Sequence, residues 1–137
     1  MYQINRTNHI VDEVKMTDNG RELIVKVDLN VERIMGRYNA ARRAIAAAQQ
    51  NVKDIQETDR KEELLPQATA QLGSAIMALF ELIFGEEQTQ RIAEFYDGDH
   101  LGMLGDFIPY LTEVVMPKIQ KAQEQLASKY TGWAAGH

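Results

Sequence analysis

Hydrophobic and polar residues alternate in the first part of the chain, between residues 9 and 29. Leu23, Val25, Val27 and Leu29 occupy every second position, which is the period of a β-strand with one buried face. Asn19-Gly20 precedes this run, and both residue types accept the positive φ angles of a tight hairpin turn. The pattern predicts a β-hairpin over residues 9–29. Because an isolated hairpin is marginally stable in water, we expect it to pack on helices or to pair with another chain.

From residue 30 the hydrophobic period changes to alternating steps of three and four residues, which is typical of a helix with an apolar seam. Asn30 precedes the seam and suits the N-cap position. The seam comprises Val31, Ile34, Tyr38, Ala41, Ile45, Ala48, Val52 and Ile55. A helix over this stretch is about 40 Å long, which is long for a chain of 137 residues. We expect part of it to project or to pair with another copy.

Two further apolar stretches predict the rest of a helical bundle. The first covers residues 65–84 and ends at Gly85, after which we expect a short helix at 86–96. The second covers residues 101–126, where Pro109 and Pro117 predict a broken or kinked helix. The predicted fold is mainly α (α+β), with an N-terminal β-hairpin followed by a bundle of about four to five helices. We expect a single domain over 1–137, in which 9–29 form the hairpin, 30–130 are helical and 131–137 form a flexible tail.

Composition narrows the range of functions. The net charge is −5, so we expect no nucleic-acid binding, which normally requires a basic surface. The absence of cysteine excludes disulfides, zinc–thiolate sites and a thiol nucleophile. The longest apolar run, at 75–84, is interrupted by Glu81 and falls short of the roughly 18–20 residues of a membrane span. We therefore expect a soluble protein of the cytoplasm that binds no membrane.

The segment Asp97-Gly98-Asp99-His100 is the strongest candidate for metal chemistry. Calcium loops of the EF-hand type require oxygen ligands at their fifth and twelfth positions, which Leu101 and Ile108 occupy when Asp97 is the first. The alternative is structural: Gly98 ends one helix and Asp99 caps the next. We favour the caps and assign no metal-ligating residue. A metal-dependent enzyme that uses Asp97, Asp99, His100 and Asp106 stays open as a less favoured hypothesis.

No other motif indicates catalysis. P-loop, dinucleotide-binding and nucleophile-elbow patterns do not occur, so we assign no catalytic or cofactor-binding residue, expect no cofactor, and expect that the chain is not an enzyme. Met35, Met77, Met103 and Met116 lie on or near the apolar stripes. Methionine is flexible and fits varied neighbours, so two interpretations stay open for these residues: core filling, or an adaptable groove for apolar helices.

The second half of the chain resembles a known family. The run Ala78–Gly85, then Glu87-Gln88-Thr89, Ile92–Tyr96 and the segment between the two late prolines are similar to the tail assembly chaperones of long-tailed phages and of prophage-like elements in Gram-positive bacteria. The order of a β-type start, a long charged helix and an apolar helical half also agrees. The resemblance covers about residues 20–130 and carries no catalytic signature.

The resemblance implies a non-catalytic function in the host cytoplasm. Such chaperones keep the long tape measure protein soluble, help to recruit subunits of the major tail-tube protein, and are absent from the mature virion. The tape measure and tube proteins are therefore the expected partners, and the chain is expected to form a homo-oligomer. A structural or connector protein of a virion or prophage is the alternative. The apolar residues that we expect to line a partner surface are Ile34, Tyr38, Ile45, Val52, Phe107 and Tyr110.

Overall fold

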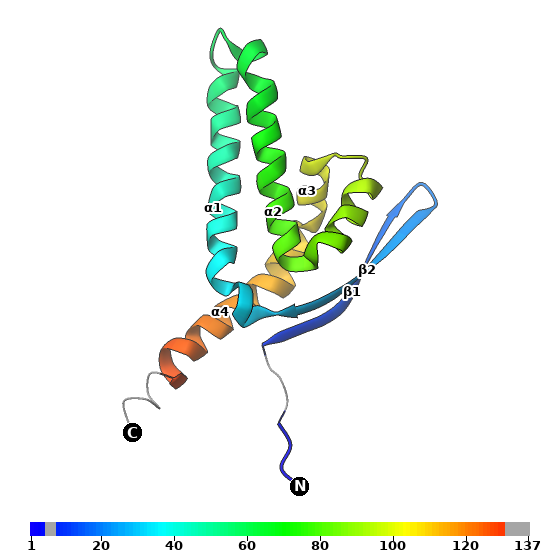
Figure 1. The fold of residues 1–137 in the computed structure, drawn as a ribbon, viewed down its shortest axis with the longest axis vertical. Coiled ribbons are helices and arrows are strands. Elements are labelled where there is room, and N and C mark those ends of the chain that lie inside the picture. The colour runs from blue at the N-terminus through cyan, green and yellow to red at the C-terminus, as the bar shows by residue number, and fades with distance from the viewer. Residues whose placement is uncertain (5–7, 131–137) are drawn as a thin grey trace.

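The structure is a computed structural model that describes residues 1–4 and 8–130, with side chains described as far as Ser128. It is mainly helical, at 72%, and begins with a two-stranded antiparallel hairpin, which confirms the predicted fold class. The predicted tail at 131–137 lies outside the described residues. The elements in chain order are β1 (His9–Asp18), β2 (Arg21–Asn30), α1 (Val31–Gln56), α2 (Lys61–Phe95), α3 (His100–Tyr110), η1 (Leu111–Val115), α4 (Met116–Gln125) and η2 (Leu126–Tyr130) (Figure 1).

The hairpin follows the sequence pattern closely. Asp18 pairs with Arg21 across the two-residue turn, in which Asn19 and Gly20 have φ angles of 47° and 83°. These positive angles match the right-handed twist of the strands. One face of β2 is buried, through Val25, Val27 and Leu29, and β2 packs on α2. The hairpin therefore obtains from a helix the hydrophobic support that two strands alone lack.

Arg21 holds the turn of the hairpin against the C-terminal end of α2. Its guanidinium donates to the carbonyl of Phe95 at 3.2 Å and to the Asp18 carboxylate at 2.9 Å. The same group lies 4.8 Å from the centroid of the Phe95 ring, a distance at which the ring quadrupole attracts a cation. The side chain of Arg21 thus joins the hairpin turn to the C-terminal end of α2.

The predicted seam of α1 faces α2 inside the subunit. Asn30 caps α1 by accepting from the amide of Glu32 at 3.1 Å, as the sequence indicates. Val31, Ile34, Tyr38 and Ile45 are buried, whereas Val52 and Ile55 near the other end are only half-buried. In Figure 1, α1 and the first part of α2 form an antiparallel pair whose far end extends beyond the other elements. The expected projection is therefore present, but its apolar seam is covered by α2.

The expectation of four to five helices is wrong, because the last part of the chain does not break. The described residues contain three helical runs: α1, α2, and one continuous run from His100 to Tyr130 that includes the π-helical stretches η1 and η2. Leu111, Met116 and Leu126 all keep right-handed helical angles. The π-helical turn η1 lies between the two prolines, and in it the amide of Met116 donates to the carbonyl of Leu111, five residues earlier. Such turns occur inside α-helices without ending them. Pro117 follows at the start of α4.

A sharp bend in α2 accounts for the predicted stop at Gly85. This residue has φ 82° and ψ 164°, which is not a helical conformation, and glycine adopts it without a steric penalty. Figure 1 shows that α2 changes direction here and returns alongside the hairpin. The 86–96 segment is therefore present as the second limb of α2.

Three phenylalanines join α2 to α3 in the centre of the core. The Phe107 ring lies 5.1 Å from that of Phe80 and 5.5 Å from that of Phe84, with both pairs close to edge-on. The Phe80 and Phe84 rings are 5.7 Å apart. Edge-to-face aromatic pairs of this kind contribute about 0.5–1.5 kcal/mol beyond their buried area. This cluster fixes how α3 approaches α2.

Among the described residues, α2 alone is long and apolar enough to cross a membrane, which the uninterrupted runs of the sequence did not indicate. Of its most apolar stretch, 44% is buried inside the subunit, where α2 packs on α1, α3 and β2. The core helix of a soluble protein has the same length and composition, so this feature is weak evidence for a membrane.

The structure assigns Asp97-Gly98-Asp99-His100 to helix ends. Asp97 and Gly98 have positive φ angles of 53° and 78°, and the Gly98 amide donates back to the carbonyl of Ala93 at 3.0 Å. Asp99 accepts from the amide of Gly102 at 3.0 Å, so it caps α3. These contacts confirm the predicted helix stop and helix cap.

Asp99 and Gly102 should be energetically coupled. A Cβ on Gly102 would lie 2.4 Å from Oδ2 of Asp99, so Gly102→Ala displaces the capping carboxylate. We expect Asp99→Ala to cost about 1 kcal/mol. Gly102→Ala should be close to neutral in the wild-type background, because the better helix propensity of alanine offsets the lost cap, and stabilising by about 1 kcal/mol in Asp99→Ala. Denaturant unfolding of the four proteins measures this coupling, and additivity within about 0.5 kcal/mol would contradict it.

Candidate partner-binding groove

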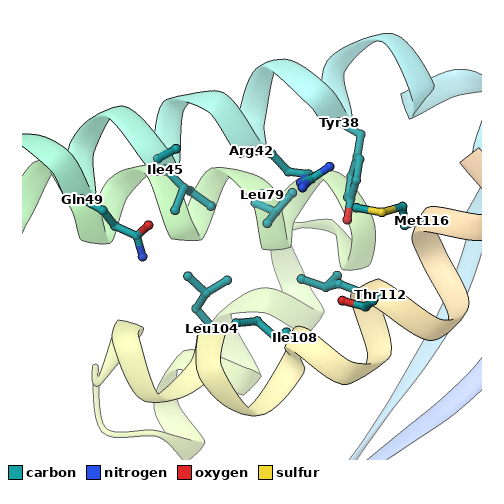
Figure 2. A pocket seen from close by; sticks show the side chains of 11 residues that line it. Tyr38, Arg42, Ile45, Gln49, Leu79, Leu104, Ile108, Thr112 and Met116 are labelled. Atoms are coloured by element: carbon teal, nitrogen blue, oxygen red, sulfur yellow. The ribbon is translucent and has the colours of Figure 1, made fainter.

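A groove with a mostly apolar lining lies between α1 and α3. Its volume is about 310 Å³. Figure 2 shows side chains of α1 and of the α3–η1 run pointing towards each other across it. The lining residues are Tyr38, Arg42, Ile45, Ala46, Gln49, Leu79, Leu104, Ile108, Leu111, Thr112 and Met116.

The groove follows from the way in which the helices pack. Both α1 and α3 pack on α2, and α1 also packs on α4. Leu79 of α2, which is buried, lies at the bottom of the groove between α1 and α3 (Figure 2). Ile45 forms one wall, and Leu104 and Ile108 form the other. Ile108 is 50% exposed, so apolar surface here faces water in the isolated subunit.

Polar groups in the groove are few. Arg42 lies over the Tyr38 ring, with its guanidinium carbon 5.9 Å from the centroid, and none of the ion pairs within the described residues involves it. Burial raises the pKa of the Tyr38 phenol, and the charge of Arg42 partly offsets this effect. Gln49 and Thr112 complete the polar part of the lining. The site thus offers apolar walls and one cation without a carboxylate partner.

This chemistry suits the apolar face of a helix. A groove between two helices, lined with branched aliphatic side chains, accepts residues spaced at i, i+3, i+4 and i+7 on an incoming helix. Met116 lines one end, and its flexible side chain adapts to different shapes. Of the two interpretations of the methionines, Met116 fits the groove, whereas Met103 is buried in the core.

The six residues predicted for a partner surface are separated by the fold. Tyr38 and Ile45 line the groove. Ile34 and Phe107 are buried in the core and do not line the groove. The heptad-like pattern does not distinguish a seam against another subunit from a seam against the next helix.

The other two predicted residues also lie outside the groove. Val52 is half-buried in the extended part of α1, and Tyr110 is half-buried beside β1. Sequence reasoning missed Leu104 and Ile108 as lining residues. Leu104 and Ile108 carry the signal in their spacing of four, but only the three-dimensional packing shows that α1 leaves them uncovered.

Three of the four candidate metal ligands, Asp97, Asp99 and Asp106, line one hollow, but two of them have other hydrogen-bond partners. Asp99 is occupied by the helix cap, and Asp106 accepts from the hydroxyl of Tyr96 at 2.7 Å. His100 packs on α2, where a Cβ at Gly73 would lie 2.6 Å from its Nδ1. In the part of the chain that the structure describes, no three histidine, aspartate or glutamate side chains are grouped so as to hold a metal ion.

Tyr110 joins α3 to the hairpin on the opposite side of α3 from the groove. Its hydroxyl donates to the Asp12 carboxylate at 3.4 Å, and its ring stacks on Phe84 at 6.3 Å. Burial, together with the charge of Asp12 and the hydrogen bond to it, raises the pKa of Tyr110 to about 12. The folded state therefore favours the neutral phenol.

This pKa predicts a loss of stability at high pH. Because the folded pKa lies above the usual value of 10.0, the contribution of Tyr110 is complete below pH 10 and is lost as pH rises from about 10 towards about 12. Tyr110→Phe should make the alkaline decline in unfolding free energy shallower. Tyr2→Phe, at an exposed position, serves as the control. Equal declines in wild type and Tyr110→Phe, measured by denaturant unfolding, would contradict the assignment.

Comparison of the chain with protein-family models, with curated proteins and with solved structures gives no match.

Proposed function

We propose that this chain is a phage tail assembly chaperone. In this function it binds and keeps soluble the tape measure protein, helps to recruit subunits of the major tail-tube protein, acts in the host cytoplasm and is absent from the mature virion. The observation that carries the proposal is the solvent-open apolar groove between α1 and α3. The resemblance of residues 20–130 to the tail assembly chaperones suggests the tape measure protein as the partner.

The groove has the properties that a holding chaperone requires. Such a protein binds apolar segments that would otherwise aggregate, and it needs no catalytic group. The walls supplied by Ile45, Leu104 and Ile108 are apolar, and the volume of about 310 Å³ accepts a few side chains of a helix rather than a whole folded domain. A tape measure protein is long and helix-rich, so it presents many equivalent segments for many copies of this chain.

Arg42 implies a preference for partner helices that carry acidic residues. Its guanidinium lines the groove without a carboxylate partner among the described residues. An incoming helix that carries aspartate or glutamate beside its apolar stripe gains a charge-assisted contact there. The net charge of the chain is −5, which on average disfavours acidic helices elsewhere on the subunit.

The proposal is tested by co-expressing the chain with the tape measure protein and measuring how much of the tape measure protein stays soluble and co-purifies. Ile108→Glu places a charge in the groove at a position that is already 50% exposed, so it should fold normally. Because burying an isoleucine side chain contributes about 1.5–3 kcal/mol, we expect the apparent affinity to fall about tenfold or more.

Leu126→Glu is the matched control. Leu126 is 49% exposed and lies outside the groove. The substitution introduces the same charge as Ile108→Glu, so co-purification should match the wild type. Equal loss in both variants would overturn the proposed site. A tape measure protein that is insoluble with and without the wild-type chain, or the presence of the chain in purified virions by mass spectrometry, would favour the structural or connector alternative.

A further inference from the structure

The outer edge of β1 carries unpaired backbone groups. The amide of Val31 donates to the carbonyl of Asn8 at 2.9 Å, so Asn8 and Val31 form a hydrogen-bonded pair. In the same register Ile10 lies opposite Leu29, two residues further along. Hydrogen-bonded pairs alternate with non-hydrogen-bonded pairs in an antiparallel ladder. The even-numbered residues of β1 therefore bond to β2, and the amides and carbonyls of Val11, Glu13, Lys15 and Thr17 point to the outer edge.

One local contact agrees with this assignment. The amide of Glu13 donates to the side chain of Asp12 at 2.8 Å, which requires that this amide be free of the β1–β2 ladder. The edge is also open. The sheet formed by the described residues has two strands, and Figure 1 shows β1 on the side of the hairpin away from α2 near the start of α1, whereas the two strands cross in this view nearer the turn. There residues 14–17 border an open hollow of about 220 Å³ together with Tyr96, Asp106, Phe107 and Tyr110. Val11 on this edge strand is 77% exposed.

The charges along the edge select one register for pairing with a second copy. If two β1 strands pair antiparallel about a two-fold axis at Val14, Glu13 of each copy lies opposite Lys15 of the other. Moving the axis to Glu13 or to Lys15 places identical charges opposite each other, which is unfavourable. The same register sets Val11 opposite Thr17, a pair of β-branched residues that suits neighbouring strands.

We propose that β1 is a self-association edge: it pairs antiparallel with β1 of a second copy of this chain, with the two-fold axis at Val14. The product is a four-stranded sheet in the order β2–β1–β1–β2, in which the edge amides of both copies are paired. Such pairing is isologous and closes as a dimer. The proposal does not depend on the chaperone function, because it rests on the hairpin alone.

The outer edge of β2 is the competing surface, and the structure favours β1. Arg21 at the start of β2 reaches the carbonyl of Phe95 in α2, and β2 packs on α2, so α2 lies beside β2. Within the hairpin Lys15 pairs with Glu22 of β2 at 3.0 Å, but its side chain is 55% exposed, so it stays accessible to Glu13 of a second copy. On β1, Glu13 forms no ion pair within the described residues.

Two proline variants distinguish the two edges. Lys15 and Ile24 lie directly opposite each other in the hairpin, and neither amide belongs to the β1–β2 ladder. Proline removes one outward amide at either position, so Lys15→Pro blocks the edge of β1 and Ile24→Pro blocks the edge of β2 with similar strain on the hairpin. Circular dichroism melting checks that both variants fold.

Sedimentation velocity over a range of concentrations gives the dimer dissociation constant. We expect the wild type to dimerise, Lys15→Pro to raise the dissociation constant at least about tenfold, as loss of a pair of interface hydrogen bonds implies, and Ile24→Pro to match the wild type. A wild type that is monomeric at every concentration, or a dimer lost with Ile24→Pro and kept with Lys15→Pro, would overturn the proposal.

Disulfide trapping tests the register in the otherwise unmodified chain. The sequence contains no cysteine, so Val14→Cys introduces one thiol per copy, and the proposed axis places the two thiols opposite each other at a non-hydrogen-bonded pair. The Cα separation of such a pair, about 4.5 Å, is within the range for a disulfide. We expect rapid covalent dimerisation on oxidation, whereas Lys26→Cys on β2 should stay monomeric. Equal cross-linking rates for the two variants would refute this register.

Discussion

Burial of the apolar surface of α2 is the interaction on which the rest of the structure depends. Ile76, Leu79, Phe80 and Ile83 are buried on this helix, and α1, α3 and β2 each pack against it. A buried aliphatic or aromatic side chain contributes about 1.5–3 kcal/mol, so these contacts supply much of the stability of a chain of this size. The hairpin is ordered because β2 covers one part of α2, and the groove exists because α1 and α3 cover two other parts without meeting.

The groove and the β1 edge serve different kinds of contact. The groove presents side chains between α1 and α3, whereas the edge presents backbone groups on the hairpin. Pairing through β1 joins copies without using the groove residues, so each subunit of a dimer keeps its site for an apolar helix. A chaperone that coats a long partner benefits from this separation, because linked copies bind neighbouring segments at a raised effective concentration.

Local features were predictable wherever the constraint lies within a few residues. The Asn19-Gly20 turn, the Asn30 and Asp99 caps and the bend at Gly85 each follow from the conformational limits of one or two residue types. The helix through Pro109 was not predictable in this way. Proline predicts a break, but the buried side chains of Phe107, Leu111 and Val115 hold both sides of it in one helical run, which includes a π-helical turn after Pro109.

The sequence by itself determined that the chain is a hairpin followed by amphipathic helices, since the periods of two and of three to four residues are properties of local geometry. Only the tertiary structure decided which seams are core and which are surface. Ile34 and Ile108 belong to equally regular patterns, but the first is buried in the subunit and the second stays 50% exposed. The difference arises because exposure depends on how helices far apart in the sequence are placed around α2, and this placement is set by the packing of all of them together.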